Sequence, residues 1–164
     1  MKFANRDRET GMTFSEVLVA VLLLGSFFPC IFEVNSVCLR FINAAKQSVA
    51  ALDSAHDRCE SLRNLNFSDL TNASSVQNLM AAPPNASDFC KNATEVVKIS
   101  AYPVPNGVTQ FTRMPDGTVT NNSVATDLGA TLVQVDVTTS WNMALGGRSR
   151  SEQAITIISN GSKK

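Results

Sequence analysis

The chain has 164 residues, about the length of one domain, with 14 basic and 14 acidic side chains and no formal net charge. This balance excludes an electrostatic argument for nucleic-acid binding, so no nucleic acid is expected as a partner. Charged residues make up 17% of the chain, below the ~25% of an average globular protein, and Val17–Phe32 has none. Beyond residue 64 the chain is rich in Asn, Ser and Thr, which is typical of a loop-rich extracytoplasmic domain.

The first 32 residues predict a retained membrane helix. Residues 1–11 are polar and contain three basic side chains, and Met12–Phe32 is almost wholly apolar. At ~1.5 Å per helical residue, that run just spans a hydrocarbon core of ~30 Å. Basic residues before the run favour a cytoplasmic N-terminus. The run is longer than the apolar core of a secretory signal, and no small-residue cleavage site follows it.

Glu16 is the one carboxylate at the head of this run, and sixteen uncharged residues follow it. A charge inside lipid is costly, so an ionisable residue there is a functional candidate by default. The alternative is that Glu16 lies near the membrane surface, where its side chain reaches water at little cost.

The spacing around Glu16 resembles a known processing signal. Gly11 is followed by Met12, three further residues, Glu16 and the uncharged run. Residues 6–32 resemble the type IV prepilin signal, a short basic leader that ends in Gly and is cut there, with Glu as the fifth residue of the mature chain. The resemblance implies that a prepilin peptidase cuts between Gly11 and Met12 and that the new amine is N-methylated. It also implies that Glu16 neutralises the N-terminal amine of a neighbouring subunit during assembly.

Two departures from the family pattern concern Met12, where the family usually has Phe, and the proline that bends the helix. The family commonly has that proline about one turn beyond Pro29, where this chain has Glu33. Pro29 removes one helical hydrogen bond in any case, so a bend is still expected near it.

The helical pattern continues beyond the apolar run. Small and apolar residues recur at three- and four-residue steps, namely at Phe41, Ala45, Ser48, Leu52, Ala55, Cys59 and Leu62. One helix is therefore predicted from Met12 to about Leu65. The predicted organisation is a leader (1–11), a membrane half of the helix (12–34), an amphipathic half (35–66) and a globular head (67–164). The fold class is α+β and pilin-like, with the long helix packed on a small antiparallel sheet.

The head is predicted to begin with a loop region and to continue as strands. Residues 66–94 are loop-like, with room for a short helix over 76–80. Strands are predicted over 95–102, 107–113, 131–141 and 153–159, and the last two are expected to form an antiparallel hairpin. Residues 114–117 read as a turn. In the third strand, one face carries Val133, Val135, Val137, Thr139 and Trp141.

Four cysteines and one histidine are the remaining candidates for chemistry. In an oxidising compartment Cys59 and Cys90 are predicted to form a disulfide, with two buried free thiols as the alternative. Cys30 and Cys38 are assigned to close helix packing. No Cys/His spacing suits zinc, so no metal and no cofactor are predicted. His56 has no neighbouring constellation for catalysis, so the chain is not expected to be an enzyme.

Two functions remain open at this stage. The first is a structural subunit of a type IV pilus or related filament, either a minor pilin or a type II secretion pseudopilin. Its implied partners are the prepilin peptidase, other pilin or pseudopilin subunits, an inner-membrane assembly platform and membrane lipid. It would sit in the bacterial inner membrane with a periplasmic head and then enter a pilus or pseudopilus. The second is an uncleaved, signal-anchored glycoprotein whose disulfide-bonded β head binds an extracellular ligand. Its support is six Asn-x-Ser/Thr sequons, at Asn66, Asn72, Asn85, Asn92, Asn121 and Asn160.

Overall fold

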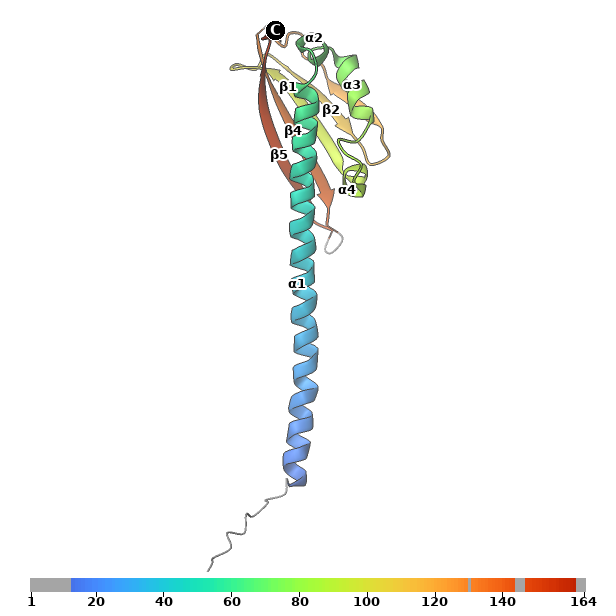
Figure 1. Cartoon of the computed structure of the whole chain (residues 1–164), viewed down its shortest axis with the longest axis vertical. Coiled ribbons are helices and arrows are strands. Elements are labelled where there is room, and N and C mark those ends of the chain that lie inside the picture. Colours follow the sequence, from blue (N-terminus) through green and yellow to red (C-terminus); the bar gives the residue numbers. More distant parts are fainter. Residues whose placement is uncertain (1–12, 130, 144–146, 162–164) are drawn as a thin grey trace, which may run out of the picture. The chain divides into compact units, whose positions relative to one another are not determined.

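The computed structural model describes residues 13–129, 131–143 and 147–161, which form one long helix, three short helices and a five-stranded sheet (Figure 1). The helices are α1 (Phe14–Arg63), α2 (Phe67–Leu70), α3 (Ala73–Ala81) and α4 (Asp88–Asn92). The strands are β1 (Thr94–Ala101), β2 (Val108–Arg113), β3 (Val119–Ser123), β4 (Leu132–Asn142) and β5 (Ser149–Ser159). This arrangement confirms an α+β chain with a long N-terminal helix and an antiparallel sheet. The chain divides into two compact units, one ending at Ile42 and the other, the head, beginning at Asn43.

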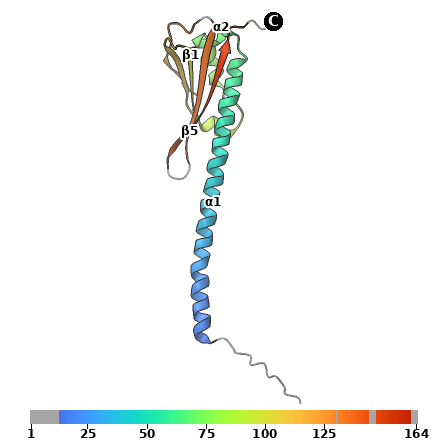
Figure 2. The ribbon, with the colours of Figure 1, turned by 90° about the vertical axis from the view of Figure 1, so that its left-hand side faces the viewer.

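Helix α1 agrees closely with the predicted single helix. It contains Pro29 and continues through it, so the lost hydrogen bond at that position does not end the helix. The upper part of α1, from Asn43 onward, belongs to the head and lies along one face of the sheet (Figure 2). Small side chains line the buried side of this part, including Ala51 and Ala55, and they let the helix backbone approach the strands closely.

The sheet has the strand order β3-β2-β1-β4-β5, and every neighbouring pair is antiparallel. The predicted hairpin of the last two strands is confirmed, since β4 and β5 pair without a break from Leu132↔Ser159 to Asn142↔Ser149. The Gly-containing loop expected between them includes residues 144–146, which lie outside the described residues.

The core of the head lies between this sheet and the upper part of α1. The predicted inward face of β4 is confirmed, because Val133, Val135 and Val137 are fully buried and Thr139 and Trp141 are nearly so. Leu62 of α1 packs into the same cluster. Each fully buried aliphatic side chain of this kind stabilises the fold by roughly 1.5–3 kcal/mol through removal of apolar surface from water.

The predicted buried stripe of α1 was right at its end and wrong before it. Ala55, Cys59 and Leu62 are buried, whereas Ala45 and Leu52 are exposed. Ala44, Ala51 and Arg58 also repeat every seven residues, each one position before a predicted residue, so the buried side of the helix is rotated from the predicted one. The buried residues that replace the predicted ones are Ala44, Ala51, Ser54 and Arg58.

The connecting region, residues 64–93 between α1 and β1, contains more structure than the sequence predicted. The predicted short helix over 76–80 lies within α3, but α2 and α4 were not expected. Both α3 and α4 begin with a side-chain cap: Asn72 Oδ1 accepts from Ser74 N, and Ser87 Oγ accepts from Cys90 N. Such caps satisfy amides that the first turn of a helix leaves unpaired, which makes helices as short as these workable.

Strand β3 was not predicted either. Its sequence is polar apart from Val119, and its other four residues are exposed, so it has no alternating pattern to detect. It exists because β2 offers it a neighbour, with a register shift between Gln110 and Phe111. The predicted turn before it is present, with Met114 N bonded to Thr118 O and Gly117 at a positive φ of 85°.

Candidate functional site

Glu16 lies in the first turn of α1 and closes a capping box. Its Oε2 accepts hydrogen bonds from Thr13 N (2.8 Å) and Thr13 Oγ1 (3.0 Å), and Glu16 N donates back to Thr13 Oγ1 (3.4 Å). A Thr followed three residues later by Glu is a known helix start, because the two residues satisfy each other's amides. The negative charge also suits the positive end of the helix dipole. Glu16 therefore has a local role that the sequence reasoning missed, although the Thr13-x-x-Glu16 spacing signals it.

This cap leaves part of the Glu16 carboxylate free. A carboxylate has about four acceptor positions on two oxygens. Both bonds to Thr13 use Oε2, and Oε1 has no partner among the described residues. Oε1 can therefore accept a hydrogen bond from a group outside this chain while the bonds of the cap to Oε2 stay in place.

The helix beyond Glu16 presents its apolar side chains outward. From Thr13 to Ile42 none of the residues is buried, and side chains such as Leu22 and Phe32 are more than 60% exposed. Within the described residues, α1 is the single helix long and apolar enough to cross a membrane. The exposed surface is therefore compatible with membrane anchoring, and it needs a covering of lipid or of other helices to leave water.

The predicted cleavage site, Gly11 and Met12, lies outside the described residues. Thr13 is the first described residue, so the cap at Glu16 is built entirely from residues beyond the predicted cut.

The predicted Cys59–Cys90 disulfide is not formed: both residues are buried free thiols. The positions of the two residues explain this. Cys59 Sγ lies 3.9 Å from Ala154 O on β5, whereas the Cys90 carbonyl accepts from Arg113 Nη1 on β2. The two residues therefore have different neighbours in the head. Burial, with a smaller contribution from nearby carboxylates, raises the pKa of Cys59 to about 11.

Cys30 and Cys38, assigned above to helix packing, are exposed free thiols on α1. They share a shallow apolar groove with Phe27, Ile31 and Val34. No partner occupies this groove in the described chain, so their predicted role in close helix packing stays a prediction.

A buried ion pair holds the head together. Arg58 on α1 donates from Nε and Nη2 to the two carboxylate oxygens of Glu95 on β1, at 2.7 and 3.0 Å. Arg58 also donates to the carbonyls of Leu79 and Ala82, at the end of α3. One guanidinium thus joins the long helix, the central strand and the connecting region. No motif in the sequence marked this pair, because its partners are 37 residues apart.

Two further polar side chains flank Glu95 in the sheet. Arg113 of β2 and Thr139 of β4 are its register partners on either side, and both are buried. Arg113 Nη1 donates to Cys90 O, while Arg113 Nε and Thr139 Oγ1 have no hydrogen-bond partner among the described residues. Arg58 binds the end of α3, and Arg113 binds α4 to the sheet. The two arginines therefore hold the connecting region against the rest of the head.

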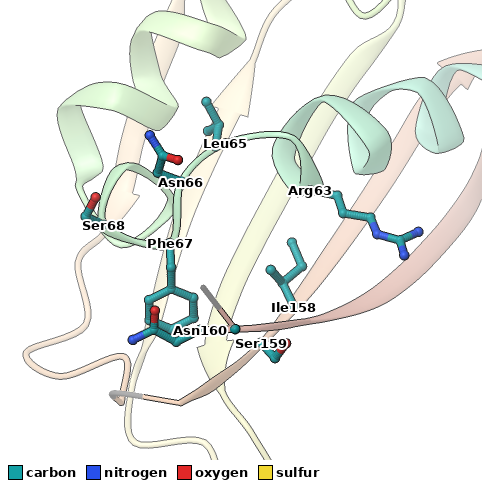
Figure 3. A pocket seen from close by; sticks show the side chains of 9 residues that line it. Arg63, Leu65, Asn66, Phe67, Ser68, Ile158, Ser159 and Asn160 are labelled. Atoms are coloured by element: carbon teal, nitrogen blue, oxygen red, sulfur yellow. The ribbon is translucent and has the colours of Figure 1, made fainter. Parts of the chain in front are cut away.

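One pocket of about 390 Å³ lies in the head between the end of α1 and the end of β5 (Figure 3). Its lining includes Arg63, Phe67 and Ile158. Figure 3 shows Arg63 extending away from Phe67, so the polar and aromatic groups do not converge on one point. The pocket therefore offers no constellation that would orient a ligand.

The described residues contain no group of His, Cys, Asp and Glu that could hold a metal ion. His56 is exposed on α1, with Nδ1 3.3 Å from the Leu52 carbonyl. In the part of the chain that the structure describes, no acid or nucleophile is bonded to His56, and we assign it no chemical role.

Comparison with known proteins gives no match. No protein-family model fits the chain, and neither a curated protein nor a solved structure is significantly similar to it.

Proposed function

We propose that this chain is a subunit of a type IV pilus or related filament, in the manner of a minor pilin or pseudopilin. The supporting observation is the combination at the start of α1. A carboxylate whose Oε1 has no partner among the described residues stands at the helix N-terminus, directly before an apolar surface that those residues leave uncovered.

In this proposal, a prepilin peptidase removes residues 1–11 while α1 is anchored in the inner membrane. The apolar half of α1 then passes from lipid into contact with the same segment of other subunits. Either covering removes the exposed apolar side chains from water, so transfer between them costs little. Glu16 Oε1 accepts from the Met12 amine of a neighbouring subunit, and the charge pair fixes the axial offset between helices.

The test must separate this docking role from the cap seen at Glu16. Glu16→Gln keeps a side chain that completes a capping box but removes the charge. Thr13→Ala removes the two hydroxyl bonds of the cap but keeps the charge and the main-chain N–H of residue 13. If docking needs the charge, Glu16→Gln should be processed normally and enter filaments at least ~10-fold less than wild type, while Thr13→Ala enters near wild-type levels. The measurement is the amount of each variant in sheared filaments against the amount in membranes.

The opposite pattern would reject the docking role. Normal incorporation of Glu16→Gln with poor incorporation of Thr13→Ala would show that Glu16 serves the helix start alone. Gly11→Ala is the companion variant, because normal N-terminal processing of that variant would remove the prepilin interpretation.

The second candidate is a signal-anchored glycoprotein whose head binds an extracellular ligand. Five of the six sequon asparagines are exposed on the head: Asn66, Asn72, Asn92, Asn121 and Asn160. The mass of the protein from its own host distinguishes the two proposals. A chain starting at Met12 supports the filament subunit, and an uncut chain with added sugar supports the glycoprotein.

A further inference from the structure

Two charged residues interrupt the apolar surface of the first unit. Beyond Glu16 and up to the end of this unit, the sequence contains two charged residues, Glu33 and Arg40, and both are exposed on α1. Neither has an ion pair or a side-chain hydrogen bond among the described residues. Strongly exposed apolar side chains lie beside them, with Val34 at 62% and Phe41 at 72%. The docking role of Glu16 leaves both of these charges unexplained.

Glu33 and Arg40 share one side of the helix but do not pair within one chain. Seven residues separate them, so they lie two turns apart, ~10.5 Å along the helix axis and ~20° apart around it. Charged side chains pair along a helix at spacings of three or four residues, about half that distance. Each charge therefore needs a partner from outside the chain once water is removed from it, because an unpaired charge in apolar surroundings is costly.

A second, parallel copy of the same segment carries the missing partners. In the proposed function, the Met12 amine of one copy meets Glu16 of its neighbour, and four sequence positions separate these two residues. In helical geometry, the first copy is then displaced by ~6 Å along the axis, toward its C-terminal end. Its Glu33 comes to the level of Val37 of the neighbour, ~4.5 Å from the level of Arg40. This is the axial spacing of an i,i+3 pair, at which opposite charges meet.

The directions of the side chains suit this pairing in one order. Side chains on a helix tilt toward its N-terminus, so Arg40 of the neighbour leans toward the level of Glu33. In the other order, Arg40 of the displaced copy lies ~16.5 Å from the level of Glu33 of its neighbour and does not reach it. The contact is therefore heterologous. Each copy uses Glu33 toward one neighbour and Arg40 toward another, which extends a series of copies.

We propose that Glu33 of one copy pairs with Arg40 of a neighbouring copy, at the axial offset that the contact between Met12 and Glu16 sets. The partner is a second copy of this chain, because the two opposite charges and their spacing belong to one segment. The pair prevents either charge from being buried alone when neighbouring helices cover the apolar surface of α1. This inference rests on the proposed function for its offset and uses residues of the first unit alone.

The first test exchanges the two charges in the full chain, expressed in its own host. Glu33→Arg and Arg40→Glu each bring like charges together across the contact. Each should enter sheared filaments about tenfold less than wild type, or worse, relative to its amount in membranes. The double variant with both changes restores opposite charges and should recover at least part of the loss. The N-terminal mass of each variant checks that it is inserted and cut normally.

A crosslink supplies the second readout. Arg40→Lys keeps the positive charge and provides an amine that a carbodiimide joins directly to a neighbouring carboxylate. Filaments of this variant should yield joined copies, and mass spectrometry of their peptides should identify a bond between residue 33 of one copy and residue 40 of another. The matched control adds Glu33→Gln to the same variant, which keeps the amine, removes the carboxylate and should give no such product.

Three results would overturn the inference. The first is entry of both charge-reversal variants at the wild-type level. The second is a failed recovery in the double variant together with no crosslink between residues 33 and 40. The third is a loss confined to Arg40→Glu, which would assign Arg40 to a lipid phosphate. A crosslink between the two residues supports the pair even where the double variant does not recover, because the exchanged side chains differ in length.

The proposed function and this pair fail separately. Normal cutting and poor entry of Glu16→Gln, with wild-type entry of both charge-reversal variants, would keep the filament subunit and remove the pair. Where the chain is uncut and forms no filament, the crosslink is sought in membranes. Its absence there would overturn the pair, whereas the N-terminal mass alone decides the processing.

Discussion

The two units of the chain treat apolar side chains in opposite ways. Up to Ile42, the described residues bury none of their side chains, whereas the head buries a contiguous cluster that contains fully buried Val97, Phe111 and Val135. The residues of this cluster are covered by the head itself, so the cluster needs no partner to leave water. The first unit leaves its apolar side chains to whatever surrounds the helix, which is why its function must be sought in lipid or in other chains.

The polar groups follow the same division. In the head, Arg58 and Glu95 are buried and bonded to each other. In the first unit, Glu16 is exposed and uses one oxygen for a local cap. The buried ion pair is part of the folded core, because the loss of either partner leaves an unpaired buried charge. The exposed carboxylate of Glu16 has acceptor positions that the cap does not use, and these can bind another molecule.

The largest expected effect comes from breaking the buried pair. Arg58→Ala or Glu95→Ala leaves an unpaired buried charge and should destabilise the head by ~3–5 kcal/mol. Thermal unfolding of the full chain in detergent, followed by circular dichroism, should shift down by roughly 10 °C or more. Arg63→Ala is the control, because its pair with Glu60 is exposed and should change stability by less than ~0.5 kcal/mol.

A double variant sharpens this prediction. Replacing Arg58 by Met and Glu95 by Leu together removes both charges, so it should be less destabilising than either alanine variant. A double variant as unstable as the sum of the single changes would show that packing, and not charge, controls this site.

The next largest effect concerns the first unit. Leu23→Arg places a charge near the middle of the apolar run and should disfavour membrane insertion by ~2.5–3.5 kcal/mol. The fraction of the protein that resists carbonate extraction should fall, whereas Leu23→Ile should behave as wild type. Unchanged extraction of the arginine variant would mean that the segment does not lie across a membrane.

The smallest effect is a chemical difference between thiols. Because burial raises the pKa of Cys59 to about 11, its thiolate is scarce at pH 8, and alkylation should be slow until the head unfolds. The rate should rise as pH approaches 11. Unfolded chains ionise this thiol near 9.0, so its contribution to stability is present below pH 9 and is lost as pH rises toward 11. Peptide mapping by mass spectrometry after timed alkylation measures this, and rapid labelling of folded Cys59 at pH 8 would contradict it.

The sequence alone determined the features that depend on local pattern. The apolar run of α1, the alternation of Val133, Val135 and Val137, and the hairpin of β4 and β5 were all predicted, because each is written in neighbouring residues. The local spacing Thr13-x-x-Glu16 also contains the cap, although it was read only as part of a processing signal.

Tertiary structure decided what depends on distant partners. In the sequence, Arg58 is one of several charged residues on a predicted helix. In the folded head it is bonded to Glu95 and to two carbonyls of the connecting region. The sequence predicted a bond between Cys59 and Cys90. In the folded head, Cys59 contacts β5 and the Cys90 carbonyl bonds to a side chain of β2. Strand β3 is polar apart from Val119 and forms only because β2 lies beside it, and the position of β5 at the sheet edge follows from strand order. Periodicity reports the side of an element that faces inward, whereas pairing across the sheet depends on contacts between residues far apart in the chain.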